Sequence, residues 1–149
     1  MSVMVIESHP LMREALCAAI AGEAEMKLAG QFASFSDAEP ALTACKPDVV
    51  LFSIGNPGLV DINEVASLRK SHPDTAILAL TSSEVSGQEQ AALDMGAQAV
   101  LGKSAPRVEL IQALRGLSTF RMDSQKMDFE HHLDHFLSGL EASSPQDNR

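Results

Sequence analysis

Aromatic and basic residues are scarce in this chain of 149 residues. It has no Trp, no Tyr and six Phe, which argues against the stacking surfaces that bind single-stranded nucleic acids. Lys and Arg number 11 against 20 Asp and Glu, and both the first 117 residues and the remainder are acidic. Direct binding to nucleic acid or to an anionic membrane is therefore not expected, since neither part offers phosphates a basic surface.

Long apolar runs and paired cysteines are missing as well. The longest apolar run falls far short of the ~18 residues that span a membrane. The first residues have neither the basic region nor the apolar stretch of a signal peptide. Cys17 and Cys45 fall in predicted helices without a Cys-x-x-Cys spacing. We therefore expect two reduced, mostly buried thiols in a cytoplasmic protein.

The apolar residues that are present form short runs that alternate with helical patterns. They make up 45% of the chain, enough for the core of a single domain. Strands are predicted at residues 3–6, 26–32, 49–52, 76–80 and 97–101. The runs at 49–52 and 76–80 have no polar break, which is typical of central strands in a parallel sheet covered on both faces.

A helix is predicted after each strand. Pro10 stands in the first turn of the first helix, and two capping boxes start the next two at Ser36 and Asp61. Gly96 ends the fourth, and the fifth is expected to face the core with Val108, Ile111 and Leu114. Five such units predict an α/β, doubly wound, flavodoxin-like sheet with strand order 2-1-3-4-5. Such sheets carry their sites at the carboxyl ends of the strands.

The order of motifs resembles the receiver domain of two-component response regulators, in the branch whose receivers precede a helix-turn-helix output. The resemblance covers residues 2–117. The stretches that carry it are Val5-Ile6-Glu7-Ser8-His9-Pro10-Leu11, Pro47-Asp48-Val49-Val50-Leu51-Phe52-Ser53, Asn56-Pro57-Gly58, Ile77-Leu78-Ala79-Leu80-Thr81 and Ala97-Gln98-Ala99-Val100-Leu101-Gly102-Lys103.

The resemblance implies a phosphorylation site at the strand ends. In such receivers two acidic residues after the first strand and an Asp after the third bind Mg²⁺, and that Asp accepts a phosphoryl group from a histidine kinase. A Thr or Ser after the fourth strand and a Lys after the fifth contact the phosphoryl group, and an aromatic residue on the fifth strand acts as a switch.

This sequence departs from that pattern at several positions. The acidic pair is Glu7 and Ser8, the acceptor position holds Ser53, and Val100 replaces the aromatic, whereas Thr81 and Lys103 match. Mg²⁺ prefers carboxylate oxygens, and a hydroxyl without a base is a weak nucleophile. The sequence therefore predicts a pseudo-receiver that works without Mg²⁺ or any other cofactor and without aspartyl phosphorylation.

Several roles stay open at this pocket. Ser53 is either a small residue at a strand end or a substrate for a Ser/Thr kinase. We predict a direct ion pair between Glu7 and Lys103, the alternative being two separately solvated charges. Thr81 is either an ordinary hydroxyl at a strand end or a retained functional one. Asn56 is either a hinge or ligand contact, or simply part of an Asn-Pro-Gly turn.

Residues 118–149 are too few for a helix-turn-helix domain. A helix is predicted at about 124–140, before a frayed polar tail. One stripe of this helix collects its apolar residues, Phe129, Leu133, Phe136, Leu137 and Leu140. The stripe either folds back on its own domain or pairs with a second copy or another protein. His131 and His135 have metal-ligand spacing, although a solvated polar face explains them too.

These features favour a signalling module that acts through protein–protein contacts, with a homodimer as one expected form. A second reading is the receiver part of a transcription regulator that reaches DNA only through a heteromeric partner. A third is a sensor of an anion or small ligand near Thr81 and Lys103. An enzyme is not expected, since no Gly-rich phosphate loop, nucleophile elbow or paired carboxylates occur at the strand ends.

Overall fold

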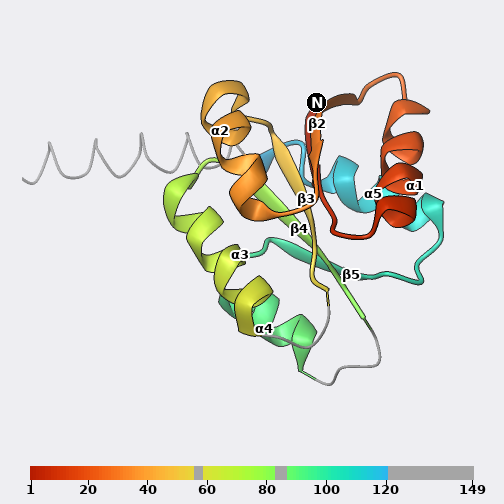
Figure 1. Ribbon diagram of the computed structural model, residues 1–149. Helices are drawn as coiled ribbons and strands as arrows, with labels where there is room; N and C mark the ends of the chain where they lie inside the picture. Colours follow the sequence, from red (N-terminus) through yellow and green to blue (C-terminus); the bar gives the residue numbers. More distant parts are fainter. Residues whose placement is uncertain (56–58, 83–86, 121–149) are drawn as a thin grey trace, which may run out of the picture.

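A single parallel sheet organises the protein. The computed structural model describes residues 1–55, 59–82 and 87–120. Within them the strands lie in the order β2-β1-β3-β4-β5, which confirms the predicted flavodoxin-like topology (Figure 1). The strands are β1 (Ser2–Ile6), β2 (Lys27–Phe32), β3 (Val49–Ser53), β4 (Ala76–Thr81) and β5 (Ala99–Gly102). The helices are α1 (Pro10–Ala21), α2 (Phe35–Cys45), α3 (Leu59–Ser71), α4 (Gln88–Asp94) and α5 (Arg107–Gly116).

Helices cover both faces of the sheet. In Figure 1, α2, α3 and α4 lie on one side and α1 and α5 on the other. Two apolar clusters fill the spaces between the layers, one centred on Ile20, Leu51 and Leu78 and the other on Phe52 and Ile77. Because β3 and β4 lie in the middle of the sheet, every one of their residues is buried, as the unbroken apolar runs predicted.

Two helices begin earlier than the capping boxes predicted. The cap of α2 is Ser34, not Ser36, and the Ser34 hydroxyl accepts a hydrogen bond from the Asp37 N–H at 3.2 Å. Pro40 consequently lies inside α2, beyond its first turn. The third helix starts at Leu59, two residues before the predicted cap at Asp61. A Ser-x-x-Asp pattern at Ser34 competes with the Ser36 box, and local spacing alone does not choose between them.

Two predicted burials are wrong. Val108 is 65% exposed, and the buried side of α5 consists of Leu110, Ile111 and Leu114. Cys17 is buried as predicted, but Cys45, the last residue of α2, is exposed. In both cases the rotation of the helix about its axis determines which of its residues are buried against the sheet.

Candidate functional site

The carboxyl ends of the strands bring the predicted pocket residues to one edge of the sheet. Glu7 follows β1, Ser53 ends β3, Thr81 ends β4 and Lys103 follows β5. The register fixes this arrangement: Ile6 pairs with Phe52, Ser53 with Leu80, and Thr81 with Gly102. The Lys103 N–H also donates to the Thr81 carbonyl oxygen at 2.8 Å. Strand order thus brings these four positions together although 96 positions separate Glu7 from Lys103 in the numbering.

Glu7 is buried, with 2% of its surface exposed, and half of its carboxylate is committed to the backbone. Oε1 accepts a hydrogen bond from the His9 N–H at 2.9 Å. The Glu7 carbonyl oxygen accepts one from Arg13 Nη1 at 2.8 Å, so this residue fixes the turn from β1 into α1. The second carboxylate oxygen, Oε2, has no hydrogen-bond partner.

The predicted ion pair between Glu7 and Lys103 is wrong. No salt bridge joins them, and Glu7 Oε2 is unpartnered while Lys103 is half-buried. The carboxylate instead folds back on a backbone donor two residues away. This local contact needs little ordering, whereas holding a long Lys side chain in one position costs conformational entropy.

The hydroxyls of Ser53 and Thr81 are buried without partners. Ser53 is 8% exposed and Thr81 is fully buried. Across the described ranges, the buried side-chain oxygens and nitrogens that lack a hydrogen bond are Glu7 Oε2, Ser53 Oγ and Thr81 Oγ1. An unpaired buried polar group costs about 1–3 kcal/mol. These uncompensated groups are therefore concentrated at the ends of three adjacent strands.

The remaining predicted pocket residues lie differently. Ser8 is exposed, so its hydroxyl is not part of the buried group. Val100 is half-buried on β5 and packs against the core beneath α2, α3 and α4. Asn56 lies outside the described residues. So do the predicted interaction stripe and the two histidines of the possible metal site, namely Phe129, His131, Leu133, His135, Phe136, Leu137 and Leu140.

The donor set at this edge does not fit Mg²⁺. Magnesium demands octahedral oxygen ligands and in proteins usually takes at least one or two carboxylates. Glu7 supplies one buried carboxylate, with one oxygen already accepting from the backbone, and Ser53 and Thr81 are neutral. In the part of the chain that the structure describes, no three His, Cys, Asp or Glu side chains gather closely enough to hold a metal ion.

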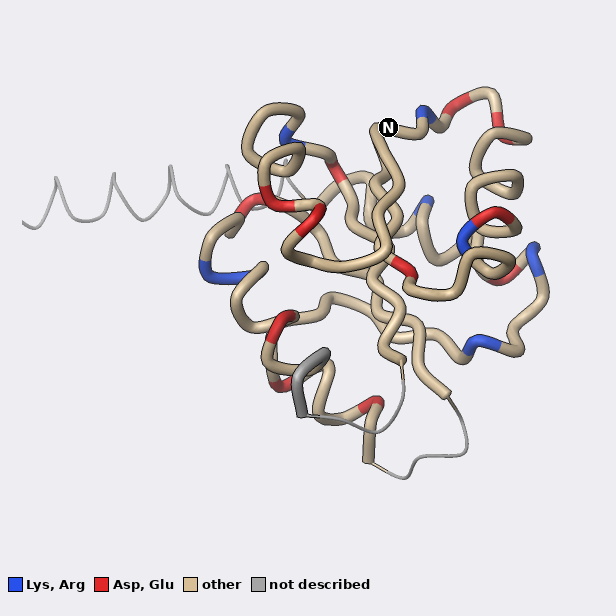
Figure 2. The backbone as a smooth tube through the Cα atoms, in the orientation of Figure 1, with Lys and Arg blue, Asp and Glu red and all other residues tan. Residues whose placement is uncertain are grey.

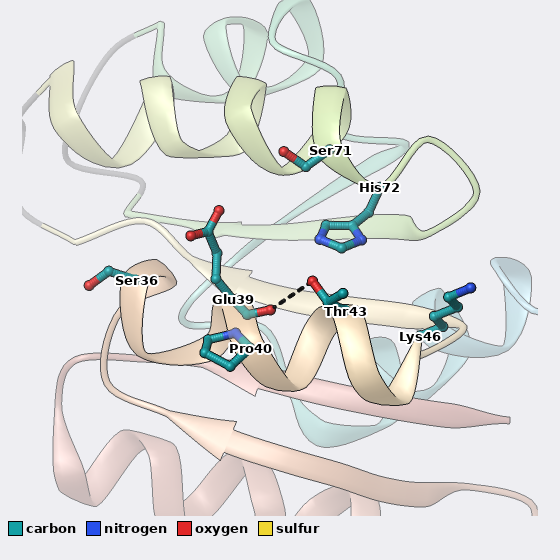
Figure 3. Close-up of a pocket in the computed structure, with 7 residues that line it drawn as sticks. All are labelled: Ser36, Glu39, Pro40, Thr43, Lys46, Ser71 and His72. Atoms are coloured by element: carbon teal, nitrogen blue, oxygen red, sulfur yellow. Dashed lines mark hydrogen bonds between the residues drawn. The ribbon is translucent and has the colours of Figure 1, made fainter.

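A cleft of about 570 Å³ lies between α2 and α3, away from the strand-end pocket. Its lining residues are Ser36, Glu39, Pro40, Thr43, Lys46, Ser71 and His72. Figure 3 shows the Glu39 carboxylate and the His72 imidazole projecting into the space between the two helices. The Thr43 hydroxyl is used within α2, donating to the Glu39 carbonyl oxygen at 3.2 Å. The sequence did not predict this cleft, because its two walls come from helices that only tertiary packing brings together.

Comparison with known proteins identifies the family. The model of the response regulator receiver domain matches residues 3–115. The chain belongs to this family of two-component signalling domains. Response regulator GacA of Pseudomonas viridiflava is 30% identical over 113 residues, which make up 76% of this chain and 53% of GacA. The chain thus spans about half the length of the GacA proteins that it matches.

Solved structures agree with this assignment. The receiver domain of the putative response regulator NarL from Mycobacterium tuberculosis superposes with a TM-score of 0.70 at 26% identity, over 79% of this chain and 95% of that one. The response regulator ChrA of a heme-sensing two-component system gives a TM-score of 0.66 at 25% identity, over 80% of this chain and 57% of ChrA. None of the helices in the described ranges has the length and apolar character needed to cross a bilayer.

Proposed function

We propose that this receiver domain signals through protein–protein contacts, independently of aspartyl phosphorylation and of Mg²⁺. Residues 1–117 form the receiver-like domain in this proposal, and 118–149 provide a C-terminal interaction segment. The partner is a second copy of the chain or another regulatory protein in the cytoplasm. The domain acts as a binding module and not as an enzyme.

The observation that carries the proposal is the state of Ser53 at the end of β3. Its hydroxyl is buried and has no hydrogen-bond partner, so no base is in place to remove its proton. A hydroxyl without such a base is a poor nucleophile at neutral pH. Phosphoryl transfer also relies on a metal ion to neutralise charge, and the lone Glu7 carboxylate supports none. Two requirements for accepting a phosphoryl group, an activated nucleophile and a bound metal ion, are therefore not met at this pocket.

The charge distribution supports a protein partner over nucleic acid. Figure 2 shows acidic and basic residues in both helical layers. Within the described residues, no long run of basic residues occurs along the chain. With a formal net charge of −9, the chain repels phosphate backbones.

A second candidate is the receiver part of a transcription regulator that works through a DNA-binding partner. Its support is the similarity to transcription regulators such as the probable transcriptional regulatory protein NarL of Mycobacterium tuberculosis, which is 27% identical over 112 residues. A pull-down from the native cell that recovers a DNA-binding protein would favour it. The third candidate, an anion sensor, rests on the unpaired Thr81 hydroxyl beside Lys103, and stabilisation by an anion in a thermal-shift screen would favour that one.

Acetyl phosphate labelling tests the main proposal. The wild-type chain and a Ser8→Asp/Ser53→Asp variant are each incubated with acetyl phosphate and Mg²⁺ and weighed by intact-mass spectrometry. The variant regains the carboxylates that the metal and the phosphoryl group need, so it is expected to gain one phosphoryl group, and only when Mg²⁺ is present. The wild type is expected to gain none. Labelling of the wild type at Ser53 or at any carboxylate of the pocket would refute the proposal.

A further inference from the structure

Arg69, near the end of α3, is the centre of a hydrogen-bond network at the amino-terminal edge of the sheet. Its Nε donates to the Gly96 carbonyl oxygen at 3.0 Å, and its Nη1 to the Pro73 carbonyl oxygen at 3.0 Å. Its Nη2 donates to Gln98 Oε1, which also accepts from the Ile77 N–H. One side chain thus joins α3, the start of β4 and the turn before β5.

Gly96 makes this network possible. Its backbone φ of +117° is a conformation that residues other than glycine rarely adopt. A Cβ atom placed there would lie 2.6 Å from Arg69 Cγ. The Arg69 side chain therefore crosses the Gly96 backbone at a distance that only glycine allows. Both this close approach and the hydrogen bonds of the guanidinium hold the Arg69 side chain in place.

The guanidinium also contacts a residue beyond the last described helix. The Phe120 ring lies over Arg69 with its centroid 5.4 Å from Cζ. Phe120 packs against the core on the α1 and α5 face, and its N–H donates to the Leu117 carbonyl oxygen at 3.2 Å. Burial lowers the pKa of the Arg69 guanidinium, which nevertheless stays charged at neutral pH. A cation on an aromatic face gains more when it is removed from water.

We infer that Arg69 is an intramolecular docking point that fixes how the chain leaves the receiver domain after α5. A chain held only by the end of one helix frays. Ser118 and Thr119 are exposed, whereas Phe120 is drawn back onto a side chain that α3, β4 and the β5 turn hold in place. The stack thus sets the position of the chain at Phe120, four residues after the end of α5. The Arg69 network lies at the opposite edge of the sheet from the strand-end pocket and shares no residue with it.

Trp fluorescence tests the docking point, because the chain has no Trp and no Tyr of its own. The Phe120→Trp variant places a single fluorophore on Arg69, and Trp is the best aromatic partner for a cation. We expect its acrylamide quenching constant to be well below that of the urea-unfolded chain. Adding Arg69→Gln is expected to raise the constant at least twofold, whereas adding Arg107→Gln, an arginine at the start of α5, leaves it unchanged.

A second measurement covers the case in which Arg69→Gln fails to fold. In ¹H–¹⁵N NMR spectra of the otherwise unaltered chain, Phe120→Leu removes the ring, and with it the ring-current shift of the Arg69 Nε–H. The amide signals of β3 and β4 should stay in place, since both strands lie in the core. An unchanged Nε–H signal, or equal quenching with and without Arg69, would overturn the inference.

Discussion

Ser2 and Asp48 hold each other across the start of the sheet. The backbone N–H of Ser2 donates to Asp48 Oδ2 at 2.8 Å, and the Ser2 hydroxyl donates to the same oxygen at 3.2 Å. In return the Asp48 N–H donates to Ser2 Oγ at 2.9 Å. These bonds join the first residue of β1 to the residue before β3, so they fix where the two strands begin to pair.

Removing this carboxylate should weaken the fold. Asp48→Ala leaves the partly buried Ser2 N–H without its acceptor, and we expect the free energy of unfolding to fall by about 2–3 kcal/mol. Asp48→Asn keeps an acceptor oxygen and should lose less than half of that. Urea denaturation followed by circular dichroism measures both. Equal losses in the two variants would show that charge, and not the acceptor oxygen, is what matters.

Thr81→Val should stabilise the protein. The Thr81 hydroxyl is fully buried without a partner, and Val keeps the shape of the side chain while removing the polar group. We expect the free energy of unfolding to rise by about 1 kcal/mol, and Thr81→Ser, which keeps the hydroxyl and loses the methyl group, to lower it by a similar amount. A loss of stability in Thr81→Val would mean that the hydroxyl is hydrogen-bonded in solution.

The two cysteines should differ in reactivity. Burial raises the pKa of the Cys17 thiol, an effect that the charge of Arg13 only partly opposes, whereas Cys45 is exposed. Because the thiolate is the reactive form, the native chain should react rapidly with iodoacetamide at one site and the unfolded chain at two. Peptide mass mapping should assign the first site to Cys45. A Cys45→Ser variant that still reacts rapidly when native would contradict this.

The pKa of Glu25 should respond to Arg115. A hydrogen bond from its own backbone N–H and then one from the Arg115 side chain lower the pKa of this exposed carboxyl. A carboxylate with a lowered pKa favours the folded state above its ordinary pKa, and this contribution is lost as the pH falls through the folded-state value. Arg115→Gln should therefore move the NMR titration midpoint of Glu25 upward, part of the way to the ordinary value.

Arg107→Gln is the matched control for that titration. Arg107 approaches Glu23 at 3.9 Å and is not among the causes that lower the pKa of Glu25. The midpoint of Glu25 should therefore stay where it is in the wild type. A Glu25 midpoint that is identical in the wild type and in Arg115→Gln would show that Arg115 does not lower the pKa of Glu25.

The sheet and its edge were predictable because they depend on patterns that many residues share. The unbroken runs in β3 and β4 require cover on both faces, and parallel strands bring their carboxyl ends to one edge. The positions of Ser53 and Thr81 at this edge were predictable, because each is the last residue of a buried strand.

The errors arose where one residue had two local alternatives. In α5, stripes through Val108 or through Leu110 share Ile111 and Leu114, and only the rotation of the helix on the sheet chooses between them. The Glu7 carboxylate could pair with Lys103 or accept a hydrogen bond from the backbone N–H of His9, and the sequence spacing does not show which partner is preferred. The Arg69 network joins α3 to the segments before β4 and β5, which are far apart in the sequence, so no local sequence pattern predicts it.

The position of β1 between β2 and β3 has a consequence for synthesis. Ribosomes release the chain from its amino end, so β1 and β2, which pair along one edge of β1 in the folded protein, emerge before β3. The other edge of β1 pairs with β3, which ends at Ser53. A nascent chain therefore carries the apolar strand β1 with one unpaired edge until β3 has left the ribosome, and an unpaired apolar edge can pair with other chains.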